Sequence, residues 1–177
     1  TPILIIEMGA YAPGEIANLC SIVKPTISAL TFIGTQHIAL FGSQEKLSCA
    51  KGEIIKSLSP DGLAVTNGDN EFCREHAANA PCKALTVGTG GHTDLEAFDI
   101  EETTDGIAFR IDDTLFTLPL HRTHNITNFL TTIAIARLLG LSDTSIATKL
   151  RTFTPPHNTF SVREERAVTI LDDTHNS

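Results

Sequence analysis

The chain has 177 residues, of which 41% are hydrophobic, with 12 glycines and 8 prolines. This length and composition suit one globular domain and exclude a disordered chain, a collagen-like repeat and a small disulfide scaffold. The 13 basic and 21 acidic residues give a net charge of −8, which argues against nucleic acid or an anionic membrane as a partner.

The first residues carry no targeting signal. They lack the basic region and cleavage site of a signal peptide, and no apolar run reaches the roughly 18 residues of a membrane span. We therefore expect a cytoplasmic protein without membrane insertion. Because the chain opens directly on a strand-like run, we also expect it to be part of a longer protein. Without a C-x-x-C pair or zinc-ligand spacing, the four cysteines are interpreted as reduced core or surface thiols: Cys20, Cys49, Cys73 and Cys82.

The first part of the chain alternates between predicted strands and helices. Apolar runs predict strands at 3–6, 27–33 and 63–66, the first of them buried on both faces. Apolar residues at helical spacing predict helices at 15–23 and 43–58, the second capped by Ser43. Strand, helix, strand, helix, strand predicts a right-handed parallel sheet.

The remainder of the chain has a different pattern. Short runs separated by turn residues predict a small antiparallel sheet over about 83–121, with strands at 83–87, 98–102, 106–111 and 114–118. Helices are predicted from Asn125, as the cap, to Gly140 and over 142–150, followed by a strand at 167–171. The expected fold class is α/β, a mostly parallel sheet flanked by helices with a small antiparallel sheet in the middle of the chain.

Acidic residues directly follow several predicted strands. They are Glu7, Asp69 and the pair Asp172-Asp173. Ligands of parallel α/β sheets bind beyond the carboxyl ends of the strands, so these acids are candidate ligand-binding residues. The alternative is that they solvate loops or cap helices.

Lys51 shares the apolar side of its predicted helix with Leu47, Ile54 and Ile55. A buried ammonium is costly unless it is paired, neutral or modified. Three alternatives follow: its stem extends past Leu47 into solvent, it pairs with Glu7, or it reacts with carbon dioxide to form a carbamate.

Three further features follow strands or begin a helix. His37 is either a hydrogen-bonding loop residue or a ligand. In His124-Asn125-x-x-Asn128, the two amides lie on one helical face, either as a cap and an exposed side chain or as contacts to a base or ribose. The loop 88–91 is not interpreted as a phosphate loop, because no helix follows it and the G-x-G-x-x-G spacing is missing. No Walker motif occurs in the chain.

Six ordered sequence blocks together resemble the central ATP-binding domain of the Mur ligase family, and most closely its MurF type. The blocks are Glu7-Met8-Gly9-Ala10 with Pro13-Gly14-Glu15-Ile16, Gly34-x-x-His37 with Phe41-Gly42-Ser43, Ala50-Lys51-Gly52-Glu53-Ile54, Asn67-x-Asp69, His124-Asn125-x-x-Asn128, and Asp172-Asp173-Thr174-x-Asn176. The resemblance implies that residues 1–177 are the central domain. A UDP-substrate domain and a Walker loop would precede it, and an amino-acid-binding domain would follow it.

The resemblance implies an ATP-dependent ligase that uses Mg²⁺. In this family the carboxylate of a UDP-muramoyl peptide attacks the γ-phosphate, and the amine, D-alanyl-D-alanine in the MurF type, then displaces phosphate from the acyl-phosphate. Metal binding is implied for Glu7, His37 and a carbamylated Lys51, the last two also being catalytic. Nucleotide binding is implied for Asn67, Asp69, His124, Asn125, Asn128, Asp173 and Asn176.

The sequence departs from the family pattern at three places. Phe32 stands where the family often has Asn, and Thr159 stands where an arginine follows prolines and glycine, with Arg163 as a substitute candidate. The usual D-D-x-Y-N reads Asp172-Asp173-Thr174-His175-Asn176. Two other hypotheses therefore stay open: another amide ligase of the superfamily, of folylpolyglutamate or cyanophycin type, and a non-catalytic binding or scaffold relative.

Overall fold

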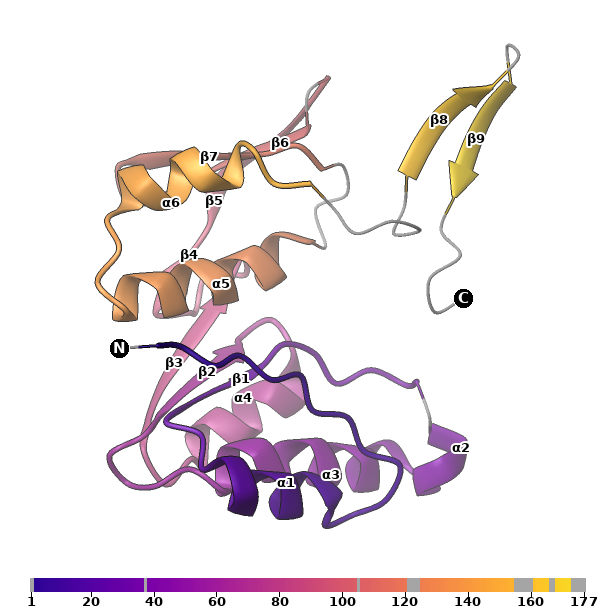
Figure 1. The fold of residues 1–177 in the computed structure, drawn as a ribbon, viewed down its shortest axis with the longest axis vertical. Coiled ribbons are helices and arrows are strands. Elements are labelled where there is room, and N and C mark those ends of the chain that lie inside the picture. The colour runs from indigo at the N-terminus through magenta and orange to yellow at the C-terminus, as the bar shows by residue number, and fades with distance from the viewer. Residues whose placement is uncertain are drawn as a thin grey trace.

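A four-stranded parallel sheet organises the first half of the chain (Figure 1). Its strands, in spatial order, are β1 (Ile27–Leu30), β2 (Leu63–Asn67), β3 (Lys83–Gly88) and β4 (Leu95–Glu96). Each neighbouring pair is parallel. This computed structural model describes residues 2–36, 38–104, 106–120, 125–154, 161–165 and 168–172.

Helices cover both faces of this sheet. On one face lie α1 (Glu15–Val23), α2 (Ile38–Phe41), α3 (Gln44–Lys56) and α4 (Glu71–Ala78), and on the other lies α5 (Ile126–Leu138) (Figure 1). Successive side chains of β2 point to opposite faces of the sheet, so the strand contributes to two hydrophobic cores. Ala64 packs in a cluster with Ile55 of α3, whereas Val65 packs in a second cluster with Leu130 of α5. The predicted parallel sheet flanked by helices is confirmed.

The small antiparallel sheet is also confirmed, with different bounds. It consists of β5 (Phe98–Thr103), β6 (Gly106–Ile111) and β7 (Thr114–Leu118), and α6 (Asp143–Leu150) packs on β7. The prediction that residues 83–87 belong to it is wrong, because β3 pairs in parallel with β2 and β4. A short strand does not encode the direction of its partners. A further pair, β8 (Ser161–Glu165) and β9 (Val168–Asp172), is antiparallel.

The predicted buried strand at Ile3–Ile6 does not form. These residues pair with no described strand, and Leu4 and Ile5 are 78% and 89% exposed. A continuous apolar run shows that a segment can be buried on both faces. It does not show that strands and helices are in place on either side of it.

The helices predicted from apolar spacing form nearly as expected. Ser43 caps α3 through its Oγ, which accepts a hydrogen bond from the Lys46 N–H at 3.2 Å. Gly140, at a φ of +86°, ends α5 in the left-handed conformation that glycine adopts most easily. Asn125 is the N-cap residue of α5, but its side chain does not accept the capping hydrogen bond. All four cysteines are free thiols, as expected. None of the helices in the described ranges has the length and apolarity needed to cross a membrane.

Candidate functional site

A cleft of about 530 Å³ opens at the carboxyl ends of the parallel strands. Its walls come from the segments after β1, β2 and β3, from the first turn of α5 and from β5. The lining residues are Thr31, Phe32, Asn67, Asp69, Thr89, Ile100, Ile126, Thr127 and Asn128. Three residues predicted to bind a nucleotide, Asn67, Asp69 and Asn128, therefore meet in one cavity.

Hydrogen bonds of Asn67 and Asp69 hold the turn after β2, which forms the floor of the cleft. Asn67 Oδ1 accepts a hydrogen bond from the Asp69 N–H at 2.8 Å, which forms an Asx turn. Asp69 Oδ2 accepts from the N–H and the hydroxyl of Thr89, at 2.8 and 3.1 Å, and its Oδ1 accepts from the Gly90 N–H at 3.0 Å. Asp69 thus fastens the loop after β3 to the end of β2. Because two loop amides already donate to this carboxylate, the geometry supports rejecting the loop as a phosphate site.

The α5 wall offers an available amide. Asn128 is exposed and, among the described residues, its side chain forms no hydrogen bond, so both its donor and its acceptor can serve a ligand. Ile126, two residues before Asn128, is fully buried in the core and holds the first turn of the helix in place. Asn125 precedes this turn but does not line the cleft.

Lys51 lies on α3, the helix that packs on β1, on the face of the sheet opposite α5. Burial raises the pKa of the Cys73 thiol to about 12, against the lowering influence of hydrogen bonds with the backbone of Ile33 and Asn67 and of the Lys51 charge. Lys51 is therefore close to the ends of β1 and β2. It is half-buried, between the buried Leu47 and Ile55, as its helix position predicted. The alternative of an ion pair between Lys51 and Glu7 does not form in this structure.

Glu7 precedes a loop that α3 holds in place. Glu53, two residues after Lys51, accepts hydrogen bonds from the N–H groups of Gly14 and Ala17 at 2.7 and 3.0 Å. Gly14 is the N-cap of α1 at a φ of +89° and has no side chain to cap the helix, so Glu53 replaces the missing cap. The Glu7 carboxylate itself is exposed and has no partner among the described residues. The same helix therefore carries Lys51 and anchors the segment that follows Glu7.

The described residues supply only part of a metal site. They contain no cluster of three His, Cys, Asp or Glu side chains that could hold a metal ion. Glu7 offers an oxygen donor of the kind Mg²⁺ prefers, and Lys51 would offer one only as a carbamate. The other sequence candidates, His37, His124, Asp173 and Asn176, lie outside the described residues, as does Thr159.

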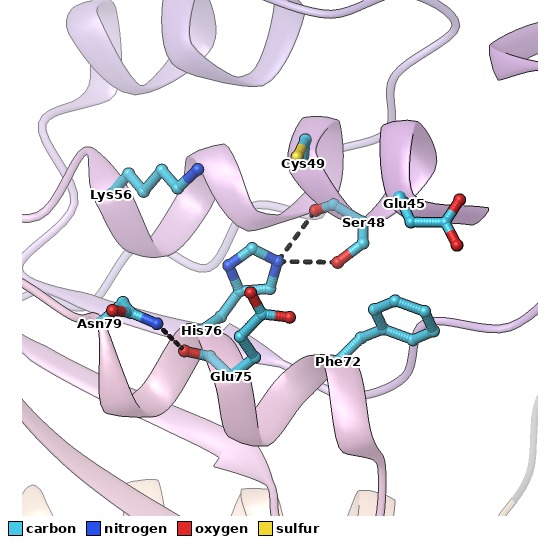
Figure 2. Close-up of a pocket in the computed structure, with 8 residues that line it drawn as sticks. All are labelled: Glu45, Ser48, Cys49, Lys56, Phe72, Glu75, His76 and Asn79. Atoms are coloured by element: carbon cyan, nitrogen blue, oxygen red, sulfur yellow. Dashed lines mark hydrogen bonds between the residues drawn. The ribbon is translucent and has the colours of Figure 1, made fainter. Parts of the chain in front are cut away.

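A second pocket, of about 470 Å³, lies between α3 and α4, away from the strand ends (Figure 2). The buried His76 ring is one of its lining groups. Its Nε2 is 2.9 Å from Ser48 Oγ and 3.0 Å from the Ser48 carbonyl oxygen. Since a carbonyl can only accept, Nε2 carries the hydrogen, and His76 acts as a structural donor that joins the two helices.

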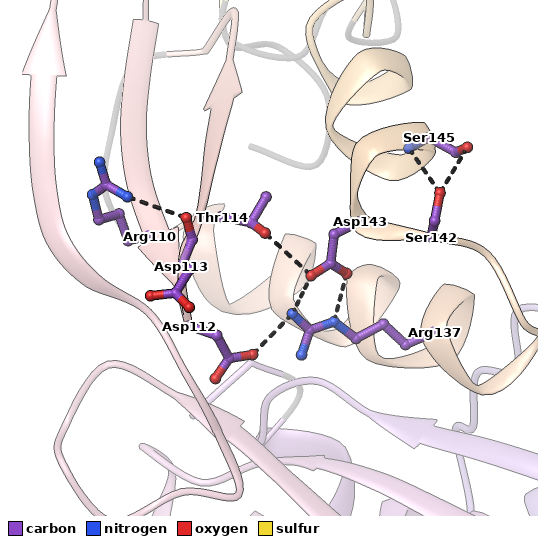
Figure 3. A network of polar contacts seen from close by, with 8 residues as sticks. All are labelled: Arg110, Asp112, Asp113, Thr114, Arg137, Ser142, Asp143 and Ser145. Atoms are coloured by element: carbon purple, nitrogen blue, oxygen red, sulfur yellow. Dashed lines mark hydrogen bonds and ion pairs between the residues drawn. The ribbon is translucent and has the colours of Figure 1, made fainter.

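A polar network fixes the far end of α5 (Figure 3). Arg137 donates two hydrogen bonds to the Asp143 carboxylate, at 2.8 and 2.7 Å, and one to Asp112 at 3.1 Å. These contacts join α5 to α6 and to the turn between β6 and β7. The network positions the helix that forms one wall of the cleft.

Sequence reasoning missed several lining residues. Thr31 and Thr89 directly follow β1 and β3, so applying the strand-end rule to every strand would have found them. Ile100 belongs to the antiparallel sheet, and its place in the cleft depends on how the two sheets pack. No local sequence signal carries that information.

A parallel sheet with a cleft beyond its strand ends is the arrangement of the α/β ligand-binding domains. Residues 1–136 match the Mur ligase middle domain, and the chain belongs to this family. It is 35% identical, over 97% of its length, to the UDP-N-acetylmuramoyl-tripeptide–D-alanyl-D-alanine ligase of Synechocystis sp. and 33% identical, over 80%, to that of Bacillus subtilis. It spans 37% and 31% of these relatives.

Solved structures of this type have the same fold. MurF from Acinetobacter baumannii superposes with a TM-score of 0.88 at 26% identity, covering 97% of this chain and 39% of that one. The MurF ligase of Thermotoga maritima in complex with ADP gives 0.80 at 29% identity, covering 95% and 40%. The chain therefore corresponds to well under half of each of these ligases.

Proposed function

We propose that the chain is the central, nucleotide-binding domain of a longer ATP-dependent ligase of MurF type that acts in the cytoplasm in peptidoglycan precursor synthesis. The observation that carries the proposal is the 35% identity to a MurF-type ligase over 97% of the chain. The cleft at the strand ends supports it, since its size and its available amide suit a nucleoside.

The nucleoside of ATP is proposed to bind at the α5 wall. Asn128 offers a donor and an acceptor to the edge of a base, and Asn67 and Asp69 build the opposing floor. Asn125, His124, Asp173 and Asn176 are proposed to complete the nucleoside site. The amides of loop 88–91 are already engaged by Asp69, so the phosphates need a cradle from elsewhere. We propose a Walker loop in the preceding part of the longer protein.

The phosphoryl end of the nucleotide is proposed to lie toward Lys51. Glu7, His37 and a carbamylated Lys51 would hold Mg²⁺, which neutralises charge on the transferring phosphoryl group. The half-buried position of Lys51, without a carboxylate partner among the described residues, supports modification. Glu53 would keep the Glu7 segment against α3 during turnover.

The proposed reaction joins a UDP-muramoyl-tripeptide to D-alanyl-D-alanine, the substrates named for the relatives. The donor carboxylate attacks the γ-phosphorus, and ADP leaves with the electrons of the broken P–O bond. The amine of the acceptor then attacks the acyl carbon, loses a proton, and expels inorganic phosphate. The flanking domains of the longer protein would bind the UDP group and the acceptor.

The nucleotide assignment is tested by Asn128→Ala in the full-length protein that carries this chain. Calorimetric titration with Mg·ADP should show affinity weakened about tenfold, the effect of losing roughly 1.4 kcal/mol of hydrogen bonding. Asn18→Ala, on the exposed surface of α1, is the matched control and should bind as the wild type does. Equal affinity of the Asn128 variant and the wild type would contradict the placement of the nucleoside.

A further inference from the structure

An exposed aromatic side chain stands at the end of β1, inside an otherwise polar part of the cleft. Phe32 is 60% exposed and lines the cleft with Asn67 and Asp69. A large apolar ring left in water at a binding cleft indicates an apolar contact with a ligand. Neither the amides of the α5 wall nor the proposed metal site uses this ring.

The packing of α3 shows on which side of the cleft Phe32 lies. Ile33, the next residue, is fully buried and packs in one cluster with Ile55 of α3, the helix that carries Lys51. The Asn70 side chain also donates to the Ile33 carbonyl at 3.1 Å, which fixes the backbone beside Phe32. α3 packs on β1, whereas α5 packs on β2 and β3. Phe32 therefore lies on the β1 side of the cleft, after the strand on which the helix of Lys51 packs.

The Phe32 ring packs against the backbone of Gly34. A Cβ added at Gly34 would lie 2.8 Å from Cε1 of Phe32, too close for any real contact. The ring therefore rests over the bare Cα of Gly34. A methyl group at position 34 would displace the ring while leaving its chemistry unchanged.

We propose that Phe32 is a specificity-determining residue that contacts the acyl-donor substrate beside the carboxylate that accepts the phosphoryl group. The inference rests on the proposed function, in which the phosphoryl group is transferred near Lys51. The family often has Asn at this position, so this chain has an apolar side chain where a polar one is usual. The donor that fits best carries an alkyl group next to its reacting carboxylate.

The test is steady-state kinetics of the full-length protein with UDP-N-acetylmuramoyl-tripeptide, ATP and D-alanyl-D-alanine. Phe32→Asn should raise the KM for the acyl donor about tenfold, and Phe32→Leu should raise it less, because Leu keeps the apolar contact. Gly34→Ala should raise the donor KM in the same direction by moving the ring. In all three variants the KM for ATP should stay within about twofold of the wild type.

Leu115→Asn is the matched control, because Leu115 is 51% exposed on β7 and does not line the cleft. It should leave both KM values unchanged, and melting temperatures should show that every variant is folded. An unchanged donor KM in Phe32→Asn, or a raised KM for ATP alone, would overturn the assignment while leaving the ligase function intact. A wild-type protein that forms no ligation product would overturn the proposed function and the Phe32 assignment together.

Discussion

Gly52 offers the sharpest structural test, because the His76 ring of α4 lies directly against it on α3. A Cβ at this position would overlap three atoms of the His76 ring. The ring is only 7% exposed and is held by its two contacts with Ser48, so it has little freedom to move away. We predict that Gly52→Ala destabilises the protein, although Ala is the better helix former.

The expected magnitude follows from opposing contributions. Overpacking a buried site costs about 1–3 kcal/mol, and losing the buried His76 hydrogen bond costs about 1–3 kcal/mol. Replacing Gly by Ala inside a helix returns about 1 kcal/mol. The net loss is about 3 kcal/mol, which lowers the melting temperature by roughly 6–12 °C for a domain of this size.

Denaturant unfolding of the single and double variants measures this coupling. In a His76→Ala background the ring is gone, so adding Gly52→Ala should be neutral or stabilise by up to about 1 kcal/mol. The same substitution therefore changes sign with the residue at position 76. If Gly52→Ala proved as stable as the wild type with His76 in place, the packing described for α3 and α4 would be wrong.

Three other predictions concern single side chains. Burial lowers the pKa of His76, so the stability of its neutral form is present above the unfolded pKa of about 6.5 and is lost as pH falls through the folded value. Unfolding free energy should fall as the pH is lowered below about 6.5, and should fall much less in His76→Asn. Glu53→Ala removes the acceptor for the N–H groups of Gly14 and Ala17, so it should lower the free energy of unfolding by about 1–2 kcal/mol and speed hydrogen exchange in α1. Glu53→Gln should have an intermediate effect. Unchanged exchange in the alanine variant would refute the capping role. Lys51→Arg should abolish ligation, and the activity of Lys51→Ala should partly recover when formate is added. A fully active arginine variant, or the absence of a carbamate signal by carbon-13 NMR, would exclude the carbamate.

Local signals predicted the elements whose pattern is complete within the segment. The cap at Ser43 and the spacing of Leu47 and Ile55 fixed α3, and alternation fixed β6 and β7 with their observed bounds. α4 escaped prediction because it is short and buries only Cys73 and His76. Its one clear signal is Asn70, whose side chain caps it by accepting from the Cys73 N–H.

Strand pairing and burial depend on segments far away in the sequence, so local patterns did not predict them. The sequence of residues 83–87 does not indicate that they pair with β2. The sequence of Ile3–Ile6 does not indicate that these residues are exposed. At the site, the strand-end rule identified Asp69 and the family resemblance implied Asn67, but neither showed that Asp69 binds the loop after β3. That role depends on the distance between two strand ends, which only the sheet sets.

The central claim is that this chain serves a MurF-type ligase, and product analysis tests it most directly. The full-length protein is incubated with ATP, Mg²⁺, UDP-N-acetylmuramoyl-tripeptide and D-alanyl-D-alanine, and the nucleotide-linked products are weighed by mass spectrometry. We predict one ADP, one inorganic phosphate and one UDP-muramoyl-pentapeptide per turnover. When D-alanyl-D-alanine is omitted or replaced by single amino acids, no pentapeptide should form and ADP should not accumulate beyond about one equivalent of enzyme. A product containing one added amino acid, or no ligation product at all, would contradict the account.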